Sequence, residues 1–370
     1  MPEFLALKYI DLNLATALQV ILLGFIGGTL SGFIGSGGAF FMTPGMMNLG
    51  VEGVVAVASN ITHKFGKAMV GSRSHGAAGN VDRRLAIFLL GTAIAGIQLA
   101  VWINVHLFKG SGDSHGAGGS AAANLYISLV FVVILSVVGI TMLRDALGSR
   151  ADGDDVSGPS RRISDFLSRL NLPPVIYFRV ADTKVSLWVL MAVGVATGYL
   201  AGTIGVGGFI GVPAMIYIFG VPTAVAAGTE LYLAMFMGAY GALSYAYQGL
   251  LDIRLTILLY VGSLIGIHLG VYGVKVVNER YIRMVTSLII LLCVFSRGIA
   301  IPVYLGQLDI INIGNQWSTY LNAASKFFLF ASGIGGALVI LFHVLKAYRR
   351  RRKIQETLLV VREPTLSKAG

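Results

Sequence analysis

Five long apolar runs limit the folds open to this chain more than any other feature of its sequence. They cover residues 85–108, 124–143, 255–276, 284–303 and 324–346. Each approaches or exceeds the roughly 20 residues that a helix needs to cross a bilayer. Only 12% of the residues are charged, whereas soluble domains carry about 25%, so polar residues could not cover a water-facing surface. The sequence predicts an all-α polytopic membrane protein, multi-pass in the cell membrane, with about 8–11 membrane segments.

The second half of the chain repeats the first at a constant offset of 170 positions. The stretch "GNVDRRLAIFLLGTAIAGIQLAVW" at 79–102 aligns without a gap with "GLLDIRLTILLYVGSLIGIHLGVY" at 249–272. Asp82 and Gly96, for example, recur as Asp252 and Gly266. The chain is therefore an internal duplication, with one unit from about 14 to 143 and another from about 185 to 303.

Each unit interrupts its first apolar segment with a glycine cluster. The clusters are "SGFIGSGGAF" at 31–40 and "AGTIGVGGFI" at 201–210. The apolar segments that follow, 38–50 and 209–220, have 13 and 12 residues. At 1.5 Å per residue they span about 19 Å, well short of a hydrocarbon core about 30 Å thick. Paired short segments of this kind predict discontinuous helices around a transporter site.

Basic residues predict how the two units lie in the membrane. The tail "KAYRRRRK" at 346–353 and the linker 144–184, with seven Lys and Arg, should be cytoplasmic. The loops 109–123 and 304–322 carry almost no basic residues and fit the outer face. Equivalent loops of the two units then lie on opposite faces, which makes the units inverted repeats. If each broken segment were a simple crossing, the units would be parallel and the basic tail would lie outside, so we favour the inverted arrangement.

The expected organisation has five parts. "SRRISDFLSRL" at 160–170 places its apolar residues on one helical face, which predicts an amphipathic helix on the inner membrane surface; a flexible cytosolic loop is the alternative. The parts are a first transmembrane repeat (1–143), a cytoplasmic linker with the amphipathic helix (144–184), a second transmembrane repeat (185–303), an extra C-terminal transmembrane segment (304–346) and a basic cytoplasmic tail (347–370).

Polar residues interrupt the segment 54–76, which must otherwise cross lipid. Asn60, Lys64 and Lys67 have i, i+4, i+7 spacing and share one helical face. A lysine at the bilayer centre costs about 3 kcal/mol on insertion scales, so an intramembrane charge indicates function. Two lysines and an amide suit a small anion. The alternative is that the lysines extend towards the cytoplasmic face.

The offset carries Asn60 to Glu230 and Ser59 to Thr229. Glu230 has no other carboxylate in its segment, 224–247. It could pair with Lys64 across the interface between the repeats, or it could carry a proton, as buried carboxylates in transporters do. A purely structural ion pair is the alternative.

The glycine clusters are candidates for the same site. Where a helix breaks inside the membrane, backbone N–H groups and the positive end of the helix dipole face the gap, which suits an anion. The alternative is close helix packing, which the spacing of Gly24, Gly28 and Gly32 also indicates. The predicted substrate-binding residues are Gly35, Gly37, Gly38, Asn60, Lys64, Lys67, Gly205, Gly207, Gly208 and Thr229, with Glu230 as the proton-coupling residue.

These motifs resemble the sulfite exporter family TauE/SafE. The resemblance rests on "SGFIGSGGAFFMTP" (31–44), "AGTIGVGGFIGVP" (201–213) and "AAGTELY" (226–232), and it covers about 14–104 and 185–303. It implies secondary transport of sulfite, sulfonates or related organosulfur anions across a bacterial inner membrane. The polar helix 59–67, the long linker and the C-terminal segment with its basic tail depart from the family pattern.

The leading functional hypothesis is a secondary anion transporter that is coupled to protons. A passive anion channel is the first alternative, and a membrane-embedded enzyme using His63, His75 and Glu230 is the second. We expect no catalytic residues, because the six histidines lack metal-ligand spacing and no nucleophile motif is present. The glycine clusters lack the residues of a nucleotide loop, so no cofactor is expected.

The expected partners are a small anionic substrate and membrane lipid. The net charge of +11 would suggest nucleic acid in a soluble protein, but here much of it lies beside membrane segments. No nucleic acid partner is therefore expected. The sequence leaves open a homo-oligomer, the identity of the anion, the direction of transport and the coupling ion.

Overall fold

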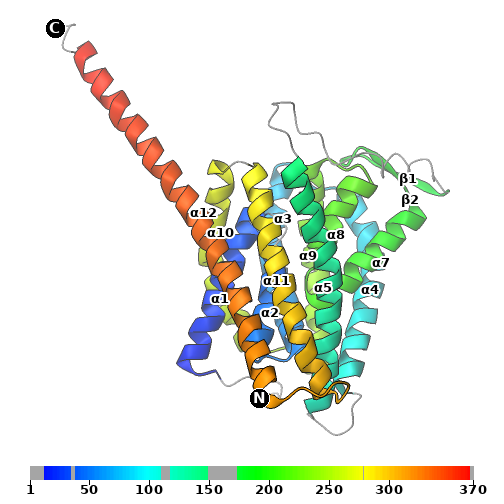
Figure 1. Cartoon of the computed structure of the whole chain (residues 1–370). Helices are drawn as coiled ribbons and strands as arrows, with labels where there is room; N and C mark the ends of the chain where they lie inside the picture. The colour runs from blue at the N-terminus through cyan, green and yellow to red at the C-terminus, as the bar shows by residue number, and fades with distance from the viewer. Residues whose placement is uncertain (1–11, 35–37, 110–116, 149–172, 278, 367–370) are drawn as a thin grey trace, which may run out of the picture.

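The computed structural model describes residues 12–34, 38–109, 117–148, 173–277 and 279–366. Within them, seven helices are long and apolar enough to cross a membrane. These helices are α1 (Leu14–Ile34), α4 (Arg83–Lys109), α5 (Ala117–Gly148), α7 (Leu187–Ile204), α10 (Ile253–Val276), α11 (Glu279–Gln307) and α12 (Asn315–Leu366). They lie side by side in one bundle (Figure 1). This confirms the predicted all-α polytopic membrane fold.

The remaining helices include the predicted short segments. In the first unit α2 (Ala39–Asn48) is followed by α3 (Gly53–Ala77). In the second unit α8 (Gly208–Pro213) continues into a π-helix, η2 (Ala214–Ile218), and is followed by α9 (Thr223–Tyr247). The first apolar segment of each unit is thus broken where the glycine clusters predicted it.

The short helices fold back along the helices that precede them. A side chain on Gly38 would collide with the carbonyl of Gly27, and one on Gly45 would collide with Leu23. Gly45 comes after Gly38 in the chain, whereas Leu23 comes before Gly27. The two helices are therefore antiparallel. In the second unit, Gly207 lies against Ala201 and Gly211 lies near Thr197, with the same sense. Both broken segments are therefore helical hairpins and not single crossings.

The first helix of each unit packs against a helix of the other unit. Gly24 and Gly28 of α1 lie directly against the backbone of Leu259 and Ser263 in α10. At the offset of 170, Gly198 of α7 lies against the backbone of Ala93 in α4, and Gly194 lies against Leu89 and Thr92. Each α1-type helix thus packs on the other unit. The close-packing explanation was correct for these glycines, which lie before the predicted clusters.

The matched helices α3 and α9 pack against each other at the centre of this arrangement. The amide of Asp82 donates to Thr229 Oγ1 over 3.0 Å, and Ser59 Oγ donates to the carbonyl of Asp252 over 3.5 Å. These two contacts are equivalent under the offset. Contacts that are reciprocal in this way are those of a two-fold relation.

Figure 1 shows where the ends of the helices lie. The strands that precede α7 lie at the end of the bundle from which α12 projects, and the start of α1 lies at the opposite end. The orientation of the two units in a membrane, and hence their inversion, stays a prediction.

Two features outside the repeats were not predicted. The described part of the linker contains an antiparallel hairpin of β1 (Val175–Phe178) and β2 (Thr183–Ser186). The predicted amphipathic helix at 160–170 lies outside the described residues. Helix α12 does not end at the membrane segment but continues through the basic tail to Leu366, beyond the bundle (Figure 1).

Candidate functional site

A hydrogen-bonded chain joins the two helix breaks. Asn60 of α3 is fully buried, and its Nδ2 donates to the carbonyl of Ala39 over 2.9 Å and to Thr43 Oγ1 over 2.8 Å. Thr43 in turn donates to the carbonyl of Ile204, the last residue of α7, over 3.1 Å. The predicted binding residue Asn60 therefore lies where the start of α2 meets the end of α7.

The end of α7 is stabilised by polar groups from the first unit and from α9. Asn104 Nδ2 donates to the carbonyls of Gly202 and Thr203, and the Tyr245 hydroxyl donates to the carbonyl of Gly202 over 2.7 Å. The last carbonyls of a helix have no partner inside the helix and need donors from elsewhere. Because side chains inside the bundle supply those donors, α7 can end at this depth without leaving its last carbonyls unsatisfied.

Gly205 forms the turn that follows. Its φ is +77°, in the left-handed region that side chains rarely adopt. A Cβ at this position would also lie only 2.9 Å from Asn60 Nδ2. Glycine is thus required both for the turn and for the approach of Asn60.

Lys64 and Glu230 form an ion pair between α3 and α9. Lys64 Nζ lies 3.6 Å from Glu230 Oε1, and the side chains are 13% and 5% exposed. None of the ammonium and carboxylate atoms has a hydrogen-bond partner among the described residues. Glu230 Oε2 also lies so close to Gly211 of α8 that a side chain there would collide with it. The pair therefore lies between the two central helices, beside the second short helix.

Lys67 lies one turn from Lys64 and reaches a different neighbour. Its ammonium donates a hydrogen bond to Ser31 Oγ of α1. Among the described residues Lys67 makes no ion pair, so Glu230 offsets only one of the two lysine charges. The centre of the bundle therefore carries an excess positive charge.

His63, on the same helix, faces α10. Its Nε2 lies 2.6 Å from Ser263 Oγ, and its ring centroid lies 4.7 Å from that of Tyr260. The Tyr260 hydroxyl donates to the carbonyl of Thr62 and accepts from the amide of Gly66. These contacts attach α3 to α10 and give His63 a packing role.

The predicted site residues are only partly brought together. Asn60 and Gly205 are in contact, and Lys64 contacts Glu230. Thr229 instead accepts a hydrogen bond from the amide of Asp82 and supports the start of α4. Five predicted residues remain. Gly38 and Gly207 pack within their own hairpins, Gly208 begins α8, and Gly35 and Gly37 lie outside the described residues.

Sequence reasoning missed Thr43 and Arg297. Thr43 gave no signal, because a threonine in an apolar segment is ordinary. Arg297 is 1% exposed in the middle of α11, where it donates to Asn48 Oδ1, to Ser325 Oγ and to the Tyr304 hydroxyl. A single arginine within the apolar run 284–303 was the available signal.

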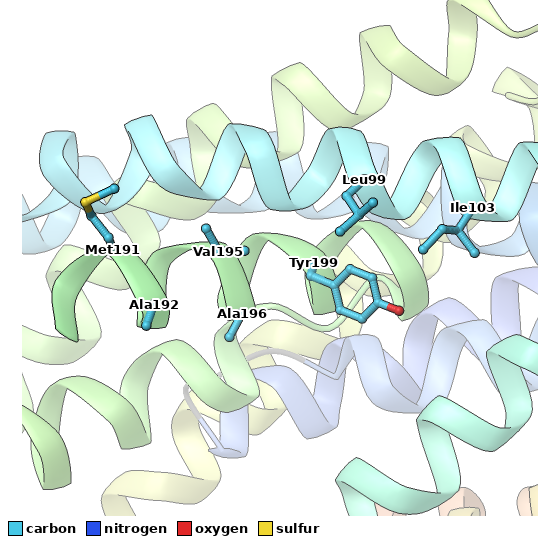
Figure 2. Close-up of a pocket in the computed structure, with 7 residues that line it drawn as sticks. All are labelled: Leu99, Ile103, Met191, Ala192, Val195, Ala196 and Tyr199. Atoms are coloured by element: carbon cyan, nitrogen blue, oxygen red, sulfur yellow. The ribbon is translucent and has the colours of Figure 1, made fainter. Parts of the chain in front are cut away.

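A hollow lies between α4 and α7, away from these polar residues (Figure 2). It has a volume of about 550 Å³, and its walls are apolar side chains such as Leu99, Met191 and Val195. Tyr199 lies at its edge, and its hydroxyl is hydrogen bonded to that of Tyr126. Exposed apolar walls of this kind suit a lipid chain rather than an anion.

The fold and this site define a class of protein. A bundle of membrane helices, with two matched broken helices and an ion pair between the central helices, is the architecture of a membrane transporter. The chain belongs to the sulfite exporter TauE/SafE family, whose model matches residues 20–296. The matched region ends one residue before Arg297 and does not include α12.

Curated relatives agree with this class. The chain is 24% identical over 276 residues to the "Probable membrane transporter protein YjnA" of Bacillus subtilis (strain 168). The similarity covers 74% of this chain and 97% of that protein. No solved structure matches the chain. The protein is thus a multi-pass membrane transporter.

Proposed function

We propose that the protein is a secondary transporter of small sulfur-containing anions, such as sulfite or a sulfonate, and that transport is coupled to protons. The name of the family supports this substrate class, and the excess positive charge at the centre of the bundle supports an anion. In this proposal Lys64, Lys67 and Asn60 contribute to anion binding, and Glu230 carries the proton.

The observation that carries the proposal is the buried Lys64–Glu230 pair. Its atoms are 3.6 Å apart and lack hydrogen bonds from other described residues. A buried charge without such bonds costs several kcal/mol unless a partner is close. No hydrogen bond fixes the pair, so either member can leave its partner when a ligand of the same charge takes that partner's place.

Exchange of partners links the proton to the anion. When Glu230 takes up a proton it loses its charge, and the ammonium of Lys64 is left without a counter-ion. An anion that enters then replaces the carboxylate beside Lys64. Because either charge alone would be left unpaired in a dry site, the proton and the anion are expected to bind and leave together.

The positions of the histidines support transport over catalysis. The enzyme hypothesis would need His63, His75 and Glu230 to meet at one place. His63 is bonded to Ser263, His75 lies beside Gly228, and Glu230 is paired with Lys64. The described residues contain no cluster of three or more His, Cys, Asp or Glu that could hold a metal ion.

Transport by reconstituted protein tests the proposal. Proteoliposomes should accumulate labelled sulfite or ethanesulfonate above the equilibrium level when a pH gradient is imposed, and a protonophore should abolish the accumulation. A passive channel cannot accumulate an anion against its gradient. Flux that only equilibrates, and that ignores the protonophore, would show that the channel alternative is correct.

A further inference from the structure

A second hollow lies where the end of α3, the start of α4 and part of α9 come together. Its volume is about 500 Å³. Its wall includes the polar side chains of Ser72, Arg73 and Arg83 together with Met69, Tyr232 and Met235. The size is within the range of about 300–1,000 Å³ that is typical of small-molecule sites. The wall combines cations with an apolar surface.

The two arginines of this hollow have no acidic partner among the described residues. The carboxylate of Asp82, the residue before Arg83, accepts hydrogen bonds from the amides of Val180 and Ala181 over 3.0 Å each. In the second unit the equivalent Asp252 instead binds the guanidinium of Arg254 at 2.7 Å. The turn of the β hairpin therefore binds the Asp82 carboxylate, and Arg83 does not form the ion pair that Arg254 forms with Asp252.

The duplicated scaffold does not need these charges. At the offset of 170, Arg73 corresponds to Leu243 and Arg83 corresponds to Ile253. Leu243 and Ile253 are 71% and 40% exposed, so the equivalent surface of the second unit is apolar. The two arginines of the hollow therefore have no basic equivalents in the second unit.

The hollow is aligned with Lys64 along one face of α3. Lys64, Ala68 and Ser72 are spaced at i, i+4 and i+8, so they lie above one another on that face. Ser72 lines the hollow, and it lies about 12 Å along the helix axis from Lys64. In this i, i+4, i+8 row the residue between them is Ala68, which is 1% exposed, and Lys67 lies beside the row. A small side chain therefore separates the hollow from the ion pair.

We propose that this hollow is an entry site for the transported anion, in which Arg73 and Arg83 hold the sulfite ion or the sulfonate group, and the methionines contact the carbon substituent of a sulfonate. The proposal rests on the proposed function, since it adds a second site for the same substrate. Two arginines at the mouth of a low-dielectric cleft raise the local concentration of an anion. The site would accordingly set the affinity for entry rather than the maximal rate.

Thiol labelling tests the site without any transport measurement. A side chain on Gly76, which lines the hollow, would meet no atom within 4 Å, and the native Cys293 is buried. Rates are expressed relative to the reaction of the same reagent with a free thiol in solution. On this scale, sulfonatoethyl methanethiosulfonate should react about tenfold faster than its trimethylammonium analogue in purified Gly76→Cys protein. Adding Arg73→Gln and Arg83→Gln should remove this preference. Gly314→Cys, also in open space, is the matched control and should show none.

Competition identifies the occupant of the hollow. Ethanesulfonate should slow the labelling of the Gly76→Cys protein. If phosphatidylglycerol micelles slow it and ethanesulfonate does not, the hollow binds a lipid headgroup and the proposal is wrong. Equal rates for both reagents would show that the arginines are only orientation signals, which also overturns it. Protection by ethanesulfonate in a protein that does not transport it would instead contradict the proposed function alone.

Transport kinetics give the second readout. In proteoliposomes Arg73→Gln with Arg83→Gln should raise KM about tenfold and leave the maximal rate within about twofold. The control is Arg84→Gln, an exposed neighbour that does not line the hollow. An unchanged KM in the double variant would overturn the proposal.

Discussion

At the scale of single residues, the molecule places its charges where they can change partners. Lys64 and Glu230 are close enough to attract each other, but at 3.6 Å they are not locked by a hydrogen bond. The fixed polar contacts lie nearby, in the chain from Asn60 through Thr43 to Ile204. The ion pair can therefore separate while the hydrogen bonds beside it hold the helices in place.

Removing the lysine charge should weaken anion binding. We expect Lys64→Met to raise the Kd for sulfite at least about tenfold, or roughly 1.4 kcal/mol, because a charge-assisted contact in a dry site is lost. Isothermal titration of the purified protein measures this change. Lys326→Met, an exposed lysine of α12, is the control and should bind as the unaltered protein does. An unchanged Kd in Lys64→Met would remove Lys64 from the site.

Replacing the carboxylate should separate binding from coupling. Glu230→Gln keeps the shape of the side chain but cannot take up or release a proton. Uptake by the unaltered protein should rise as the pH falls on the side from which the anion enters, because Glu230 must then be protonated. The variant should bind the anion and lose this pH dependence in proteoliposome assays. A variant with the original pH profile would give Glu230 a structural role only.

At the scale of elements, the two hairpins are not equally anchored. Every residue of α2 is buried, and Asn48 at its end accepts a hydrogen bond from the buried guanidinium of Arg297. The equivalent of Asn48 in the second unit is Ile218, which offers no such acceptor. The first hairpin is therefore attached to α11 and α12, and the second hairpin lacks the equivalent attachment.

Loss of this anchor should destabilise the protein. In Asn48→Ala, Arg297 loses an acceptor while it stays buried, and an unsatisfied buried group costs about 1–3 kcal/mol or more when it is charged. The free energy of unfolding in detergent should fall by about that amount. Asn322→Ala, at an exposed position of α12, is the control. Equal stability of the two variants would show that Arg297 does not need Asn48.

The turn at the end of α7 should not tolerate a side chain. Gly205→Ala would force alanine into a left-handed conformation, at a cost of about 1–2 kcal/mol, and press against Asn60. We expect a lower unfolding temperature together with reduced transport. Gly335→Ala, in open space within α12, should be neutral or stabilising. Normal stability and transport in Gly205→Ala would contradict the role given to this turn.

At the scale of the whole molecule, the packing of the first helix of each unit on the other unit makes each unit depend on the other. Helix α1 packs on α10, and α7 packs on α4, through glycines at equivalent positions. Neither unit could bury its broken helix alone. The ion pair lies on the central α3–α9 contact, so a movement of one unit against the other would change its surroundings.

Labelling of inserted protein tests the orientation. If the units are inverted, a tag at position 112 should react from outside the cell, and tags at 155 and 360 should react only after the membrane is opened. The physical reason is the concentration of Lys and Arg in the linker and the tail, which favours the cytoplasmic side. Reaction of tags at 112 and 360 from the same side would exclude the inverted arrangement.

The sequence by itself determined the class of fold, the duplication and the helix breaks. Local signals carry these features, because apolar length gives membrane helices and dense glycine weakens a helix at a fixed place. The bounds of α9 differ by one residue at the start from the segment expected at 224–247. The pairing of Lys64 with Glu230 was one of two alternatives.

Only the tertiary structure decided which residues meet. Thr43 reaches Ile204 across 161 positions of sequence, and Arg297 reaches Asn48 across 249. Such contacts depend on the angles at which helices cross and on how closely they pack. The spacing of residues within a single helix does not contain that information. For the same reason Thr229, adjacent to Glu230 in sequence, accepts a hydrogen bond from the amide of Asp82 at the start of α4. The packing of each first helix on the other unit likewise follows from burial of backbone against backbone, which a constant offset in the sequence cannot reveal.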